Sequence, residues 1–175
     1  MYEAVNDEAP AHLRQWFVLH VKPRTEKKAV VFLRIYKCFH HLPVYLKITK
    51  VQRRKVRREM PLFPGYVFAR LSPEERVNML KTNLVLSTIV IPHPRQTIHE
   101  LRQIRRARSG EAELRPVNHV FKEGDRVRVK YGPLRGTVGY VKRNGANATL
   151  CLNVEILGAS VEVSISPGDL EELES

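Results

Sequence analysis

Apolar and polar residues follow two different rhythms along this chain. In the N-terminal part, short segments rich in aromatic and β-branched residues alternate with segments whose apolar residues recur at helical spacing. Capping-box patterns begin at Ser72, with Glu75 three residues on, and at Thr97, with Glu100 three residues on. The expected strands are residues 15–21, 44–49, 66–71 and 87–91, and the expected helices are residues 25–36, a helix beginning after Ser72, and residues 97–108. Short connections between such elements predict a mainly antiparallel sheet with flanking helices.

The C-terminal part keeps a strict period of two. Its apolar residues alternate with polar ones in three runs: Val127, Val129 and Tyr131; Leu150, Leu152, Val154 and Ile156; and Val161, Val163 and Ile165. Glycine-containing turns separate these runs, so we expect about five short strands. A small SH3-like barrel is the economical arrangement, because closure removes exposed sheet edges. The predicted fold class is therefore α+β.

The change of rhythm sets the predicted domain boundaries. At 175 residues the chain is long enough for two small domains, each with a modest core. Residues 1–13 are predicted to be a flexible N-terminus and residues 14–109 the first domain. Residues 110–119 contain Gly110 and Pro116 and little periodicity, which is typical of a linker. Residues 120–175 form the second predicted domain.

Charge is distributed unevenly between the two parts. Residues 1–110 carry 22 Lys and Arg against 8 Asp and Glu, a net charge of +14, whereas residues 111–175 carry 8 against 10, a net charge of −2. A basic domain attracts polyanions, because phosphates neutralised by lysine and arginine release counterions. The alternative is a solvated basic surface that only confers solubility. Charge alone does not decide between the two.

Several classes of protein do not fit the sequence. No run approaches the roughly 20 apolar residues that cross a bilayer, so no membrane partner is expected. Residues 1–10 contain Glu3, Asp7 and Glu8 and no basic side chain, which is unlike a secretory signal, and we expect a cytoplasmic protein. No phosphate-binding loop or catalytic constellation is evident, so the chain is not expected to be an enzyme.

The two cysteines, Cys38 and Cys151, are expected to be free thiols because they are too few for a disulfide framework. Cys38 lies near His40 and His41, which invites a metal-site interpretation. A structural zinc site needs four ligands, and no second ligand cluster accompanies these residues. We therefore expect no metal and no cofactor.

The most distinctive motif is the sequence PLFPGYVF at residues 61–68. Two prolines and a glycine predict a rigid turn that leads into an aromatic-rich strand. Phe63, Tyr66 and Phe68 suit an anchor surface for a partner protein. The same aromatic residues could equally be core residues of the sheet.

A second motif lies in the C-terminal part and resembles a KOW motif, in which a glycine follows a tight bend between two barrel strands. The backbone freedom of glycine is sufficient reason for such a residue. Its residues are Gly124, Asp125, Val127, Gly132, Pro133 and Gly136.

In this order, an initial Trp16-Phe17-Val18, the FPGY segment and a terminal KOW motif resemble the NusG family of transcription elongation and antitermination factors over nearly the whole chain. The resemblance implies an N-terminal NGN domain that binds the clamp helices of RNA polymerase and suppresses pausing or termination. It also implies a KOW domain that recruits other factors, such as a small-subunit ribosomal protein or Rho. The residues that match the polymerase-binding region are Phe63, Pro64, Gly65, Tyr66, Phe68 and Trp16.

Other details resemble specialised members of the family such as RfaH and the UpxY group, in which a basic first helix contacts non-template DNA. The matching residues here are Lys22, Arg24, Lys27, Lys28 and Arg34. A second basic run falls in the loop predicted between the second and third strands, where it is either a solvated hairpin tip or a contact to upstream DNA or polymerase. It consists of Arg53, Arg54, Lys55, Arg57 and Arg58. The alternative function is that of a KOW-type ribosomal or RNA-binding protein.

Overall fold

The structure is a computed structural model that describes residues 14–51, 54–109, 114–117, 124–132, 134–144 and 147–173. The chain divides into two compact units, Met1–Pro94 and Arg95–Ser175. The predicted flexible N-terminus, residues 1–13, lies outside the described residues.

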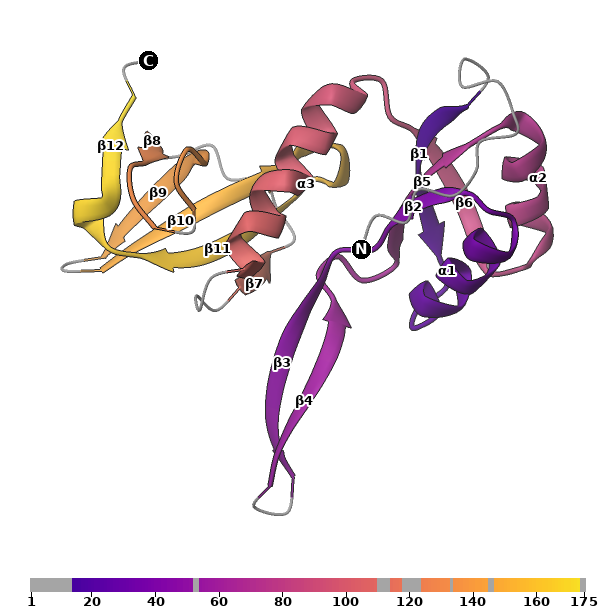
Figure 1. The fold of residues 1–175 in the computed structure, drawn as a ribbon, viewed down its shortest axis with the longest axis horizontal. Coiled ribbons are helices and arrows are strands. Elements are labelled where there is room, and N and C mark those ends of the chain that lie inside the picture. Colours follow the sequence, from indigo (N-terminus) through magenta and orange to yellow (C-terminus); the bar gives the residue numbers. More distant parts are fainter. Residues whose placement is uncertain are drawn as a thin grey trace. The chain divides into compact units, whose positions relative to one another are not determined.

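The first unit is built on a four-stranded antiparallel sheet with the strand order β2-β5-β1-β6 (Figure 1). Val18 in the central strand β1 lies opposite Phe68 in β5 and opposite Ile89 in β6. The predicted antiparallel sheet is therefore present, together with the short edge strand β2, which the sequence analysis missed. The strands are β1 (Gln15–Val21), β2 (Phe39–His41), β5 (Tyr66–Leu71) and β6 (Val85–Val90).

Helices α1 (Glu26–Ile35) and α2 (Pro73–Lys81) supply the apolar residues that cover one face of this sheet. The predicted capping box at the start of α2 is present. Ser72 N–H donates to Glu75 Oε2 over 2.7 Å, and Glu75 N–H donates to Ser72 Oγ over 3.2 Å. The core combines alternate strand residues with helix residues one turn apart: Phe17, Leu19, Val21, Ala29, Leu33, Cys38, Val67, Ala69, Leu71, Met79 and Val85.

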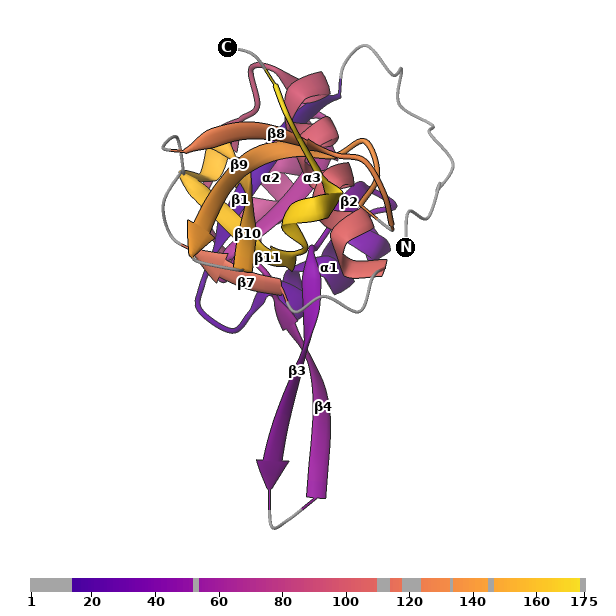
Figure 2. The same cartoon turned by 90° about the vertical axis from the view of Figure 1, so that its left-hand side faces the viewer.

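Strands β3 (Val44–Val51) and β4 (Arg54–Pro61) form a separate two-stranded hairpin. Figure 1 and Figure 2 both show this hairpin, here called the basic ribbon, projecting away from the sheet of the first unit. The prediction that the basic run lies in a loop was wrong for residues 54–58. Lysine and arginine have a weak preference for strands, but pairing with β3 satisfies their backbone groups.

The second unit contains a six-stranded antiparallel sheet with the order β12-β8-β9-β10-β11-β7. The three runs with period two supply β8, β10 and β11, as predicted. β7 lies within the range predicted as a linker and pairs with β11. The strands are β7 (Leu114–Val117), β8 (Asp125–Val129), β9 (Val138–Asn144), β10 (Asn147–Val154), β11 (Ala159–Ile165) and β12 (Leu170–Glu172), with 3₁₀ turns at Glu155–Leu157 and Pro167–Asp169.

Helix α3 (Pro94–Ser109) falls almost entirely in the second compact unit. It begins three residues before the predicted start. Pro94 is suited to the first turn of a helix, where its missing N–H has no partner to lose. Thr97, predicted to cap the helix, instead lies inside it and is only 5% exposed. The helix therefore begins at the proline and not at the predicted cap.

These observations confirm a mixed α and β fold. The predicted five-stranded SH3-like barrel remains a prediction. In the second unit the described strands form one six-stranded sheet. Within the described part of the chain, no helix is long and apolar enough to span a bilayer.

Candidate functional site

The FPGY segment forms a tight turn at residues 63–66. Tyr66 N–H donates to the carbonyl oxygen of Phe63 over 3.2 Å. Pro64 occupies the position whose φ proline presets, and Gly65 has φ +83°. This left-handed value is characteristic of the third residue of a type II turn and favours glycine. The rigid turn predicted from the sequence is therefore present.

A buried carboxylate holds this turn in place. Glu26 in the first turn of α1 is only 5% exposed, and its Oε1 accepts a 2.8 Å hydrogen bond from Gly65 N–H. The carbonyl oxygen of Gly65 accepts a second hydrogen bond, from Val21 N–H at the end of β1. The turn is thus fixed to both α1 and β1. Glu26 carries no sequence signal for this role, because an acidic residue in a first helical turn ordinarily reflects only the helix dipole.

We expect Glu26→Ala to lower the free energy of unfolding of the first unit by about 1–3 kcal/mol, because Gly65 N–H loses its acceptor. Glu26→Gln keeps an oxygen acceptor at the same distance from the backbone, so it should lower the free energy of unfolding by less. Chemical denaturation followed by the fluorescence of Trp16, the single tryptophan, measures both. Equal losses for the two variants would show that the carboxylate charge, rather than the acceptor, holds the turn.

The sheet face turned away from the core cluster is rich in aromatic residues. Trp16 meets Phe39 edge-on, with ring centroids 5.6 Å apart, and His20 stacks on Tyr66 at 5.2 Å. The rings of such pairs fix one another's orientation. Trp16 and Tyr66 are half-buried, so each retains an accessible edge. The pair of His20 and Tyr66 lies beside the 63–66 turn, and the pair of Trp16 and Phe39 lies at the opposite end of β1 and β5.

The predicted polymerase-binding residues divide into two groups by exposure. Phe63 is 4% exposed and Phe68 is fully buried, so both are packed inside the molecule. Pro64 is exposed, whereas Trp16, Tyr66 and Gly65 are half-buried. Phe63 and Phe68 therefore fit a supporting position beneath the turn better than a direct contact. The assignment of the whole set to polymerase binding stays a prediction.

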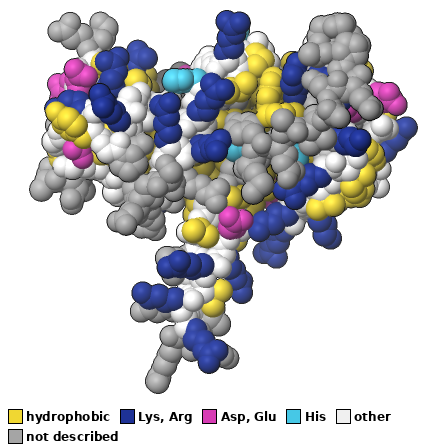
Figure 3. Space-filling model, in the orientation of Figure 1, with side chains coloured by type: hydrophobic (Ala, Val, Ile, Leu, Met, Phe, Trp, Pro, Cys, Tyr) yellow, Lys and Arg dark blue, Asp and Glu magenta, His cyan; other side chains and the backbone are white. Residues whose placement is uncertain are grey.

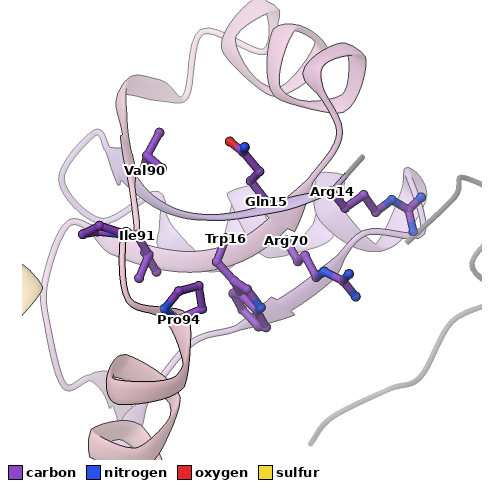
Figure 4. Close-up of a pocket in the computed structure, with 8 residues that line it drawn as sticks. Arg14, Gln15, Trp16, Arg70, Val90, Ile91 and Pro94 are labelled. Atoms are coloured by element: carbon purple, nitrogen blue, oxygen red, sulfur yellow. The ribbon is translucent and has the colours of Figure 1, made fainter. Parts of the chain in front are cut away.

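A shallow hollow of about 420 Å³ opens beside Trp16 (Figure 4). Trp16 and Arg70 lie directly opposite each other on β1 and β5, and their side chains point to the same side of the sheet. Arg14 is fixed by a 2.6 Å salt bridge to Glu75. An indole and a guanidinium at one surface suit contact with a partner's aromatic or acidic side chain. The lining residues are Arg14, Gln15, Trp16, Arg70, Val90, Ile91, Pro92 and Pro94.

One of the basic residues predicted around the first helix contacts the basic ribbon. Lys27 Nζ donates to the backbone carbonyl of Glu59 in β4 over 3.2 Å, which links α1 to the ribbon. Arg24 has φ +64°, an unusual value for a residue other than glycine. The exposed basic residues predicted to contact DNA here are Lys22, Arg24, Lys27, Lys28 and Arg34.

Basic side chains also line the basic ribbon. Lys47 lies opposite Arg58 in the register of the two strands, and like charges placed opposite each other destabilise a hairpin. A polyanion bound here would relieve that repulsion. Figure 3 shows lysine and arginine side chains on both sides of the projecting hairpin. Among the predicted residues, Arg54, Lys55, Arg57 and Arg58 are exposed on β4, and Arg53 lies outside the described residues.

The residues of the KOW motif lie at the start of β8 and in the bend that follows it. Gly132 and Gly136 have φ of +76° and +81°, as the motif's need for glycine predicts. Gly136 N–H donates to the carbonyl of Val129 over 2.8 Å, which closes the bend. Val127 is fully buried, and Gly124 and Asp125 are exposed. Pro133 lies outside the described residues.

The thiols of Cys38 and Cys151 are both free and buried. Burial, with a contribution from Glu75, raises the pKa of Cys38 to about 12. Burial also raises the pKa of Cys151 to about 11. Both groups are therefore neutral and weakly nucleophilic at ordinary pH. The described residues contain no group of three or more potential metal ligands.

The geometry describes a two-unit α+β protein whose surface features, an aromatic face beside a rigid turn and a basic ribbon, suit contact with macromolecules. Residues 14–108, more than half of the chain, match the family described as NusG, transcription termination factor nusG. The chain belongs to the NusG family, whose members are transcription factors and not enzymes.

Solved structures show a similar fold. Among them is the structure titled "Domain interaction in Thermotoga maritima NusG", which matches with a TM-score of 0.52 and 20% sequence identity over 94% of this chain and 100% of that chain. At this identity the match supports the fold alone. No curated protein sequence matches the chain.

Proposed function

We propose that this NusG-family protein is an elongation or antitermination factor that binds RNA polymerase through its first unit. The observation that carries the proposal is the 63–66 turn, which two hydrogen bonds fix to α1 and β1. A turn fixed in this way loses little conformational entropy when a partner binds, so more of the contact energy appears as affinity. Its exposed Pro64 and half-exposed Tyr66 present the contact.

The clamp helices of the polymerase are the proposed partner. A helical coiled coil offers apolar ridges, which fit a surface of ordered aromatic rings such as Trp16 and Tyr66. Phe63 and Phe68 are buried, so they support the contact indirectly by holding the turn and β5 in place. Binding across the clamp would stabilise its closed state and thereby suppress pausing or termination.

Nucleic acid is the second proposed partner of the first unit. Residues 1–94 carry 17 Lys and Arg against 7 Asp and Glu, a net charge of +10. The hydrogen bond from Lys27 to the backbone carbonyl of Glu59 places the start of α1 against β4, so the basic side chains of the two elements lie on neighbouring parts of the unit. Non-template or upstream DNA at a transcribing polymerase would supply phosphates to these basic side chains.

The second unit is proposed to recruit another factor, such as a small-subunit ribosomal protein or Rho. Tyr131, 63% exposed, stands next to the KOW bend, and Lys130 Nζ lies 5.6 Å from its ring centroid. The bend itself is held by the hydrogen bond between Gly136 and Val129. An exposed tyrosine on a fixed bend is typical of a protein-binding surface.

The polymerase contact is tested by measuring the affinity of the full chain for purified RNA polymerase. We expect Tyr66→Ala to weaken binding by about 2 kcal/mol, or roughly 30-fold, as truncation of an anchor residue does. The lifetime of transcriptional pauses in the presence of the factor should revert toward the value without it. The variant should remain folded, because Tyr66 is half-buried and lies at the edge of the turn.

Tyr131→Ala is the matched control, since it removes an exposed tyrosine from the second unit. It should leave polymerase affinity unchanged while weakening any binding of a recruited factor. Unchanged polymerase affinity in a folded Tyr66→Ala protein would reject the assigned contact. A variant at Phe63 is less informative, because loss of this buried ring would also destabilise the unit.

A further inference from the structure

Helix α3 has two opposite faces of different character. Its buried positions recur at helical spacing and include Thr97, Leu101, Ile104 and Ala107. Its exposed face carries a row that we call the arginine stripe: Arg95, His99, Arg102 and Arg106, at intervals of four, three and four residues. Such intervals place side chains in line along one side of a helix. Figure 3 shows lysine and arginine side chains gathered over α3.

Polar contacts fix α3 to the strands of the second unit. Gln103 is only 8% exposed, and its Oε1 accepts a 2.7 Å hydrogen bond from Val138 N–H at the start of β9. Gln96 Nε2 donates to Glu155 Oε2 over 3.0 Å. Because these contacts fix the rotation of the helix, the arginine stripe faces outward as a preformed surface of that unit.

The position of α3 changes the charge of the second unit. Residues 111–175 alone have a net charge of −2, whereas residues 95–175 contain 13 Lys and Arg against 11 Asp and Glu, a net charge of +2. The only acidic residue of α3 is Glu100, whose Oε1 accepts a hydrogen bond from Gln96. Burial raises the pKa of Glu100, which favours its neutral form. The helix therefore places no acidic residue of its own in the arginine stripe.

We propose that the arginine stripe of α3 is a second nucleic-acid site, separate from the first unit, that binds the phosphate backbone of a double helix. At 1.5 Å per residue, the eleven-residue interval from Arg95 to Arg106 spans about 16 Å. Phosphates follow one another every 3.4 Å along the axis for each strand, so the stripe is long enough to contact those phosphates that face it along about five base pairs. Three of its four side chains are arginines, whose planar guanidinium group suits bidentate contact with phosphate.

The site gives the second unit a binding role that its strands alone do not suggest. Backbone phosphates carry no base sequence, so the stripe would fix position on a duplex without selecting a sequence. DNA and RNA duplexes offer the same phosphate chemistry and are distinguished by experiment. The site does not depend on the polymerase contact, since it lies on a different unit and is measured without polymerase.

The test uses the full chain with Arg95, Arg102 and Arg106 all replaced by glutamine. Binding to a 20-base-pair DNA duplex and to an RNA duplex of the same sequence is measured by fluorescence anisotropy over a range of salt concentrations. For the DNA duplex, the slope of log K against log salt should fall by about 2.7, because each lost phosphate contact contributes about 0.9. Affinity at low salt should fall by about tenfold or more.

The matched control replaces Arg126, Arg128 and Arg135, which are exposed elsewhere in the same unit, by glutamine. It removes the same charge and should leave the slope nearly unchanged. A third variant with lysine at the three stripe positions keeps the charge and should retain most of the affinity. If the lysine variant retains its affinity and the glutamine variant keeps its thermal unfolding transition, loss of folding is excluded as the cause.

The proposal is overturned if the stripe and control variants lose affinity equally, since the effect would then be one of net charge. It is also overturned if the unaltered chain binds neither duplex, or if the stripe variant binds as well as the unaltered chain. A selective loss for one duplex supports the site and identifies that nucleic acid as its ligand. An equal loss for both supports recognition of the backbone common to them.

Discussion

Phe68→Ala is expected to lower the free energy of unfolding of the first unit by about 3–5 kcal/mol. Phe68 is fully buried and is the largest of the fully buried side chains. It stands opposite Val18 in β1 and His41 in β2, so its ring packs at the middle of the sheet. Removal of the ring leaves a cavity that the surrounding strands cannot fill, and this cost is added to the loss of apolar burial.

Denaturant titration followed by Trp16 fluorescence measures this loss, because the single tryptophan lies in the same sheet. Tyr36→Ala is the control: it removes an aromatic ring that is 36% exposed at the end of α1, and it should cost about 1 kcal/mol or less. A small effect of Phe68→Ala would mean that the ring is accessible, which would restore it as a direct polymerase contact.

Gly139→Ala is expected to destabilise the second unit by about 3 kcal/mol. A Cβ atom built on Gly139 would lie 2.6 Å from the carbonyl oxygen of Cys151 and 3.0 Å from the side chain of Leu150. The oxygen belongs to the backbone of β10, so it cannot move without disturbing the pairing of β9 with β10. Strand separation at this point must therefore increase, and packing in the core is lost.

Trp16 lies in the first unit, so its fluorescence does not report on β9 and β10. Hydrogen exchange of the amides in these two strands measures the change instead. Protection should fall in these strands and stay unchanged in the first unit. Gly168→Ala is the control, because a Cβ there would meet nothing closer than 3.9 Å. It should change stability by no more than about 0.5 kcal/mol. Equal protection in the Gly139 variant would show that the two strands can separate at little cost.

The sequence alone determined the features that depend on neighbours in the chain. Period-two runs predicted β8, β10 and β11, and helical spacing predicted α1. Ser72 and Glu75 form the predicted capping box, whose partners are three residues apart. The turn at residues 63–66 follows from Pro64 and Gly65, which preset the backbone angles. Each of these signals acts within a few residues, so local chemistry was sufficient.

For the candidate site, the sequence predicted which residue types matter but not which of them are exposed. Aromatic residues at the turn suited both a core and a surface, and only the packing of the sheet buried Phe63 and Phe68 while leaving Tyr66 half-exposed. Glu26 was missed because its partner, Gly65, is 39 residues away. A hydrogen bond over that separation leaves no pattern in one sequence.

Tertiary structure also decided where the basic residues lie. Arg54, Lys55, Arg57 and Arg58 are strand residues because β3 pairs with them, although their own preference for strands is weak. Helix α3 has a clear helical pattern, but its place in the second unit depends on the contact between Gln103 and Val138, 35 residues apart. Local periodicity therefore fixed the elements. Long-range pairing and burial decided which unit each element joins and which side chains face a partner, because both depend on residues that meet only after the chain has folded.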